Sequence, residues 1–313
     1  FNMGVDPVDY KQAEVDANDL QFAAQMGTTH VVLQSYANAG IVPGDERWEY
    51  DDLLQLRQRV EDAGLVLEAL ENVPLKFYDQ VMLGGPDRDR QIENMVYTVR
   101  NIARAGIPIF GYHWMPTLVG RTLLTTKIRA GAQVTAFDLE EASKRPLLMD
   151  RRYTEDEMWE NLEHWIKIII PVAEEEGIRT GIHPCDPPVA ELQGIPQLFR
   201  SFEAYKRLIG IVESPSNCIE FCQGTFSEME DAKGDGIYEM IEYFGEREKI
   251  LYVHFRNVSE TVPNFQEEFI NTGHVDMYRA MESYKKIGFE GMFVDDHVPI
   301  VVGDSPWGHR GRA

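Results

Sequence analysis

Four residues of types that bind metals recur at regular spacing in the second half of the chain. His183, Cys222, His254 and Asp296 each stand at or near the end of a short apolar run, and successive members are 39, 32 and 42 residues apart. Imidazole, thiolate and carboxylate are donors that divalent metals use in proteins. Each residue alone has an ordinary interpretation, as a core histidine, a small buried cysteine or a helix-capping aspartate. Their regular spacing favours one shared metal site.

The mixture of donors narrows the choice of metal. Nitrogen and sulfur ligands suit Mn²⁺, Fe²⁺, Co²⁺ or Zn²⁺ better than Mg²⁺ or Ca²⁺, which prefer oxygen. We expect a divalent ion with Mn²⁺ as the first choice and Fe²⁺, Co²⁺ or Zn²⁺ as alternatives. Cys185 and Cys218 are interpreted as structural residues.

Further polar residues lie close in sequence to the ends of the same runs. Arg121 and Arg256 are cations in an acidic chain, which suggests recognition of a substrate carboxylate. The alternative for both is a salt bridge at the rim of the site. We take as catalytic candidates His297, Tyr112 and Arg256, and as substrate-binding candidates His113, Arg121, Asn257 and Asp186.

Eight short apolar runs alternate with longer amphipathic segments, and this alternation predicts how the site residues are positioned. Helices are expected in at least four of the intervening segments, at 45–63, 87–105, 154–176 and 275–287. Because each crossover helix returns the chain to the same end of the sheet, the strands are expected to be parallel. The predicted strands are 1–5, 30–35, 65–72, 107–114, 179–186, 217–224, 250–257 and 291–297.

Eight strand–helix units in about 300 residues match a (β/α)8 TIM barrel, an α/β fold whose active site lies at the C-terminal ends of the strands. An open, doubly wound sheet is the alternative. It ranks lower because the turn after the first run has no G-x-G-x-x-G pattern.

The chain is predicted to form a single catalytic domain over residues 1–313, with a long lid-like loop at about 113–152. Few residues follow the eighth run, and glycine and proline among them disfavour the closing helix of the barrel. An uncovered barrel edge would expose apolar side chains. We therefore expect a native chain that is longer at both ends and, separately, a homo-oligomer such as a dimer.

Composition excludes several classes of function. The 30 basic and 52 acidic residues give a formal net charge of −22, which disfavours partners such as nucleic acids or anionic membranes. No apolar run has the length of a membrane span. Three cysteines are too few for a disulfide framework, which favours a reducing, cytoplasmic location. The expected partner is a small molecule.

From about residue 90 onward the chain resembles the mannonate dehydratases of the hexuronate pathway. The resemblance rests on the segments HPCDPP, SPSNCIEFCQGTFSEM, VHFRNV, GHVDMYRAM and NIARAGIPIFGYHWMPTLVGRT. It implies a TIM barrel, metal ligands at His183, Cys222, His254 and Asp296, and a catalytic histidine at His297. The implied reaction converts D-mannonate to 2-keto-3-deoxy-D-gluconate.

This chain departs from the family pattern in the half of the site that would bind substrate. His113 stands where the family has Asn, Val119-Gly120 where it has Asp-Trp, and Val294-Asp295 where it has Arg-Pro. A divergent member acting on D-mannonate or a related aldonate is therefore the first interpretation. The alternatives are a metal-dependent sugar isomerase or epimerase on the same barrel, and an inactive barrel that serves as a binding protein.

Overall fold

The computed structural model describes residues 2–3, 17–35, 38 and 40–304. Eight strands form one sheet, and their order in the sheet is their order in the sequence. The pairs β1/β2, β2/β3, β3/β4, β7/β10 and β11/β13 are parallel. This is the topology of the predicted TIM barrel. The strands are β1 (Asn2–Met3), β2 (His30–Gln34), β3 (Val66–Glu71), β4 (Ile109–His113), β7 (Arg179–His183), β10 (Asn217–Cys222), β11 (Ile250–His254) and β13 (Met292–Val294).

The chain folds into two compact units, each built from three separate segments. The first comprises Phe1–Pro116, Asp156–Ile182 and Ile209–Ile219, and the second comprises Thr117–Glu155, His183–Leu208 and Glu220–Ala313. The boundaries between the units cut β7 and β10, so that the ligand-bearing ends of these strands belong to the second unit.

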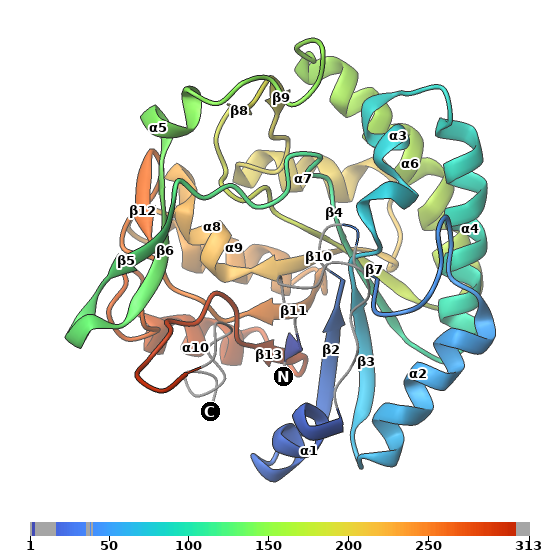
Figure 1. The fold of residues 1–313 in the computed structure, drawn as a ribbon, viewed down its shortest axis with the longest axis horizontal. Helices are drawn as coiled ribbons and strands as arrows, with labels where there is room; N and C mark the ends of the chain where they lie inside the picture. Colours follow the sequence, from blue (N-terminus) through green and yellow to red (C-terminus); the bar gives the residue numbers. More distant parts are fainter. Residues whose placement is uncertain (1, 4–16, 36–37, 39, 305–313) are drawn as a thin grey trace. The chain divides into compact units, whose positions relative to one another are not determined.

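The first unit contains strands β1 to β4 and the helices that follow them. In α2, Leu53, Leu56 and Val60 are buried, which is the spacing of an apolar helix face. This helix packs against β3 and α4 (Figure 1). Trp165 on α6 lies in an aromatic cluster whose other rings include Tyr78 and Trp114. The helices are α1 (Ala17–Gln25), α2 (Tyr50–Asp62), α3 (Asp79–Leu83), α4 (Arg88–Arg104) and α6 (Glu155–Glu176), with the 3-10 turn η1 (Leu75–Phe77).

The second unit adds an antiparallel sheet of strands β12, β6 and β5 to its share of the barrel strands (Figure 1). Phe137 and Phe265 pack on each other in this sheet and belong to a small buried cluster with Val189 and Val258. Helices α9 and α10 pack together. The sheet is β5 (Leu123–Lys127), β6 (Gln133–Asp138) and β12 (Asn264–Gln266), and the other elements are η2 (Arg129–Gly131), α5 (Leu139–Ser143), β8 (Glu191–Leu192), β9 (Ile195–Pro196), α7 (Phe202–Ile211), α8 (Gln223–Glu228), η3 (Glu230–Ala232), α9 (Gly236–Gly245) and α10 (Met277–Lys286).

All eight predicted strands contain an observed strand, and the four predicted helices correspond to α2, α4, α6 and α10. The segment predicted as a long lid-like loop instead contains β5, β6 and α5. After β13 the described residues continue to Asp304 without a helix, and the remainder of the predicted tail lies outside the described residues. Among the described helices, none is both long and apolar enough to span a membrane.

Candidate metal centre

The structure brings the four predicted metal ligands together. His183, Cys222 and His254 are the last residues of β7, β10 and β11, and one potential ligand atom from each lies within 4.8 Å of the others. Asp296 lies two residues beyond β13, in which Val294 is in register with His254. Its Oδ2 is 3.8 Å from Cys222 Sγ and 3.7 Å from His254 Nδ1. Three donors therefore cluster at the strand ends, and Asp296 lies beside two of them, Cys222 and His254.

Cys222 is suited to metal binding by its burial and its neighbours. Burial alone would raise the pKa of its thiol, but the charges of and hydrogen bonds from His183 and His254 outweigh this and lower the pKa to about 5. The thiolate is the form that binds metal. Cys222 also begins α8, where Sγ accepts a hydrogen bond from the backbone N–H of Thr225 at 3.5 Å. The donor set thus fits a divalent transition metal.

The orientation of the His183 ring is defined by the backbone carbonyl group of the next residue. Its Nδ1 lies 2.7 Å from the carbonyl oxygen of Pro184, so Nε2 is the nitrogen that a metal would use. Nearby is Glu220, a fully buried carboxylate that the sequence-based reasoning did not single out. Its position two residues before Cys222 on the same strand places both side chains on one face, which was the available signal.

Arg256 lies just beyond β11 and is surrounded by acidic groups. Its Nε and Nη2 donate to the two carboxylate oxygens of Glu267 at 2.6 and 2.7 Å, and Nη2 also donates to Glu228. Its Nη1 donates to Asp186 at 3.2 Å and lies 3.6 Å from Asp296 Oδ2. Arg256 therefore forms the salt bridges of the predicted alternative, but it is only 2% exposed, so they are buried and do not lie at the rim.

Arg121 joins the same cluster from the segment before β5. Its Nη1 and Nη2 bind the two oxygens of Asp186 at 2.5 and 2.9 Å, and Nη2 donates to Glu267 at 2.7 Å. Both guanidinium groups therefore already have carboxylate partners. A substrate carboxylate bound by either arginine would have to compete with these partners.

The pKa values of two acidic groups in this cluster are shifted in opposite directions. Burial and the negative charge of Asp186 raise the pKa of Glu228 well above its usual range, despite the nearby arginines. Burial would also raise the pKa of Asp186, but Arg121 and Arg256 outweigh it and hold that pKa well below the usual range. Sequence reasoning missed Glu228 and Glu267 because neither follows a barrel strand directly.

His297 lies three residues beyond the end of β13. Its backbone φ is 45°, in the left-handed region, which re-aims the chain after Asp296. Its Nδ1 is 3.7 Å from Glu267 Oε1, its Nε2 is 3.8 Å from Asp296 Oδ1, and its side chain is 26% exposed. The His297 side chain is therefore near the predicted ligands and accessible to solvent.

Asn257 is occupied by backbone partners. Its amide nitrogen donates to the carbonyl oxygens of Ile270 and Val275, and its amide oxygen accepts from the N–H groups of Val258 and Val275. The side chain is fully buried. In this structure it fixes the loop before α10.

Tyr112 and His113 belong to the first compact unit. Tyr112 is buried against Phe110 and Trp165, and burial raises the pKa of its phenol above the usual range. The Nδ1 of His113 accepts a hydrogen bond from the N–H of Met115 at 3.2 Å, and Tyr78 donates to the His113 carbonyl oxygen.

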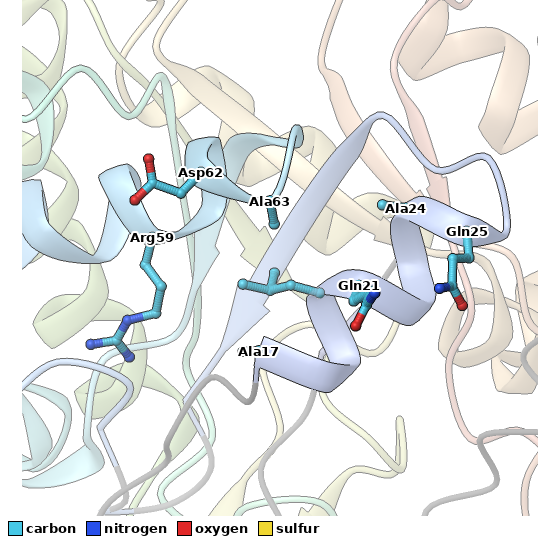
Figure 2. Close-up of a pocket in the computed structure, with 8 residues that line it drawn as sticks. Ala17, Gln21, Ala24, Gln25, Arg59, Asp62 and Ala63 are labelled. Carbon is cyan, nitrogen blue, oxygen red and sulfur yellow. The ribbon is translucent and has the colours of Figure 1, made fainter.

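A hollow of about 600 Å³ lies between α1 and α2 of the first unit (Figure 2). Its lining comprises Ala17, Leu20, Gln21, Ala24, Gln25, Arg59, Asp62 and Ala63. Apart from one arginine and one aspartate, these side chains are uncharged, and none is a candidate site residue. The hollow belongs to the helix layer and does not contribute to the metal centre.

Comparison with known proteins identifies similar chains. A family model described as D-mannonate dehydratase (UxuA) matches residues 10–149 and 142–312. The mannonate dehydratase of Thermotoga maritima is 30% identical over 309 residues, covering 87% of this chain and 82% of the relative. Mannonate dehydratase 2 of Halalkalibacterium halodurans is 30% identical over 292 residues, covering 85% of this chain and 81% of the relative.

Two solved structures have folds similar to that of this chain. The mannonate dehydratase of Streptococcus suis serotype2 superimposes with a TM-score of 0.85 at 28% identity, covering 99% of this chain and 90% of that chain. The D-psicose 3-epimerase of Clostridium cellulolyticum H10 superimposes with a TM-score of 0.58 at 12% identity, covering 99% of this chain and 90% of that chain. The second likeness shows a shared fold alone.

Proposed function

Because this chain belongs to the mannonate dehydratase family, we propose that it catalyses the metal-dependent dehydration of D-mannonate, or of a closely related aldonate, to a 2-keto-3-deoxy acid. The family relation makes it a hydro-lyase of sugar acids. The observation that carries the metal dependence is the convergence of His183, Cys222, His254 and Asp296 at four strand ends.

The four ligands would hold the ion through two imidazoles, one thiolate and one carboxylate. We propose Mn²⁺ as the ion, with Fe²⁺, Co²⁺ and Zn²⁺ as the alternatives this donor set accommodates. A bound divalent ion would supply positive charge beside the substrate carboxylate, where negative charge develops when the C2 proton is removed.

Dehydration removes the proton from C2 and the hydroxyl group from C3, and the hydroxyl leaves as water once it is protonated. The enol formed then converts to the 2-keto acid. We assign His297 to proton transfer at these carbons, since it lies beside Asp296 and is reached by solvent. Tyr112 is the second candidate for a proton donor. Arg121 and Arg256 are the candidates for binding the substrate carboxylate, which would have to replace one of their present carboxylate partners such as Asp186. His113, Asp186 and Asn257 stay substrate-binding candidates from the sequence, although Asn257 is held by backbone groups.

The test is to incubate the purified protein with D-mannonate and excess Mn²⁺, and to measure formation of a 2-keto acid that is lighter than the substrate by one water. We expect turnover that is lost on chelation and restored by Mn²⁺. Absence of product from D-mannonate and from a panel of related aldonates would overturn the proposal.

A second candidate is sugar isomerisation or epimerisation at the same metal centre. It is favoured by the residues at His113, Val119-Gly120 and Val294-Asp295, which depart from the family pattern around the proposed substrate. Such a reaction leaves the mass of the sugar unchanged. Mass spectrometry of the product therefore separates the two candidates in one assay.

We further propose that the enzyme acts in the cytoplasm as a homo-oligomer. The first point is supported by its three cysteines, which are buried and form no disulfide. Light scattering of the purified protein measures its oligomeric state.

A further inference from the structure

Glu220 is a buried acid that the proposed reaction does not use. It lies on β10, is 0% exposed, and belongs to the same compact unit as the four ligands. Its Oε1 is 3.3 Å from Nε2 of His254 and 3.8 Å from Nε2 of His183. Burying a carboxylate is costly unless it has partners of opposite charge or hydrogen-bond donors.

The two nitrogens of His254 face different groups. Its Nε2 faces Glu220, and its Nδ1 lies 3.7 Å from Asp296 Oδ2. The same aspartate oxygen is 3.8 Å from Cys222 Sγ. Ligand atoms bound tetrahedrally at roughly 2.0–2.3 Å from one ion stand roughly 3.3–3.8 Å apart. Asp296 Oδ2 therefore lies at the ligand-to-ligand spacing of a metal site from both His254 Nδ1 and Cys222 Sγ.

One imidazole gives only one nitrogen to a given ion, and the other nitrogen then carries the proton. We propose that Glu220 is a positioning residue, which pairs with Nε2–H of His254 and holds the tautomer that offers Nδ1 to the metal. Carboxylates commonly orient metal-binding histidines in this way. The inference rests on the proposed function, because it requires the metal centre.

The role differs from direct ligation. If Glu220 bound the ion together with Nε2 of His254, then Nδ1 would face Asp296 and Cys222 without serving the same ion. Pairing through Nε2 instead leaves Nδ1 of His254, which faces Asp296, for the ion, and His183 would contribute Nε2 because its Nδ1 faces the Pro184 carbonyl oxygen.

The experiment compares metal binding by the wild-type protein with that of Glu220→Ala and Glu220→Gln. Co²⁺ and Zn²⁺ affinities are measured by competition with a chelator, and the thiolate-to-cobalt absorption band reports whether Cys222 still binds. Glu68→Gln is the control, since Glu68 is a partly exposed strand glutamate of the other unit. Circular dichroism checks that each variant folds, and the near-isosteric Gln variant keeps the test valid should Ala misfold.

We expect Glu220→Ala to weaken metal affinity by about 10- to 100-fold. Glu220→Gln, whose amide oxygen can still accept a hydrogen bond, should recover part of the loss, and the thiolate band should persist in both variants. Affinity within about twofold of wild type in both variants would overturn the positioning role. A changed cobalt ligand-field spectrum without rescue by Gln would overturn it in favour of direct ligation.

These outcomes separate the inference from the proposed function. A wild-type protein that binds one ion per chain, with variants that bind equally well, defeats only the role of Glu220. A wild-type protein that binds no ion defeats the metal centre, and the inference falls with it. Dehydratase turnover by the wild type is measured independently.

Discussion

Cys222 ends β10, begins α8 and lies among three other potential metal donors. Replacing it with alanine removes the one sulfur ligand without adding bulk. Cys222→Ala should therefore bind much less metal and lose turnover, while its circular dichroism spectrum remains close to that of the wild type. Metal content measured by mass spectrometry checks this.

The matched control is Cys218→Ala on the same strand. Cys218 is equally buried, but its Sγ donates to the Pro215 carbonyl oxygen at 3.1 Å, away from the ligands. This variant should keep its metal. A normal metal content in Cys222→Ala would contradict the four-ligand centre.

His297 is predicted to move protons and not to bind the ion. Asparagine is a suitable replacement because it cannot act as an acid or base near neutral pH and it tolerates the left-handed backbone of this position. His297→Asn should lose most turnover, at least 100-fold, and retain stoichiometric metal. His164→Asn on α6 is the control and should remain active. Near-normal turnover of His297→Asn on the true substrate would disprove the assignment.

Asp186 links stability to pH through its two arginine partners. Its pKa in the folded protein lies below that of the unfolded chain, so its contribution is present above about pH 4 and is lost as the pH falls further. Asp186→Asn should lower the free energy of unfolding at pH 7 by about 3–5 kcal/mol, because two buried arginines each lose one of their carboxylate partners. Denaturant unfolding at several pH values measures this. A difference between variant and wild type that does not shrink below pH 4 would refute the linkage.

Among individual residues, the sequence predicted which side chains gather at the strand ends better than it predicted what surrounds them. The ligand candidates could be found because strand ends recur about once per strand–helix unit, which makes their spacing visible. Glu267 could not be found in this way, since it follows the short strand β12 and meets Arg121 from 146 residues away. Such pairs depend on tertiary packing, which spacing along the chain does not reveal.

Helix α8 approaches the end of β11 closely at a glycine. A Cβ on Gly224 would stand 2.4 Å from Cδ and 2.7 Å from Nε of Arg256. Gly224→Ala must therefore displace the arginine that pairs with Glu228 and Glu267. We expect destabilisation of about 1–3 kcal/mol and reduced turnover, measured by thermal unfolding and by the dehydratase assay.

The control for Gly224→Ala is Gly210→Ala in α7. A Cβ there meets no atom within 4 Å, and alanine favours the helix over glycine by roughly 0.5–1 kcal/mol. This variant should be as stable as the wild type or more stable. Equal behaviour of the two alanine variants would contradict the close approach of α8 to Arg256.

Buried strands were easier to predict from the sequence than exposed ones. The barrel strands were visible because buried parallel strands are apolar along their length, as in Ile250–His254, where every residue is buried. Strand β5 has four exposed residues out of five, including Leu123 and Leu124, so it shows neither a continuous apolar run nor alternation. Its partner β6 and the following α5 were consequently read as part of a loop.

For the whole molecule, regular alternation of strands and helices was sufficient to predict the parallel sheet and its strand order. The similarity to the Streptococcus suis enzyme, with a TM-score of 0.85, agrees with that topology. The division into two interleaved units was not predicted, because its boundaries lie within β7, α7 and β10 and no change of composition marks them.

The metal should stabilise the fold as a whole, because its ligands come from the ends of β7, β10 and β11 and from just beyond β13. These positions are far apart in sequence, so an unfolded chain holds no such site. An ion that binds only the folded state at about 100 times its dissociation constant adds about 2.7 kcal/mol of stability, which raises the unfolding midpoint by several degrees. Thermal unfolding of chelator-treated protein, with and without added Mn²⁺, measures the shift. Cys222→Ala should show little or none of it, and a wild-type midpoint that does not respond to saturating Mn²⁺ would contradict binding at the four strand ends.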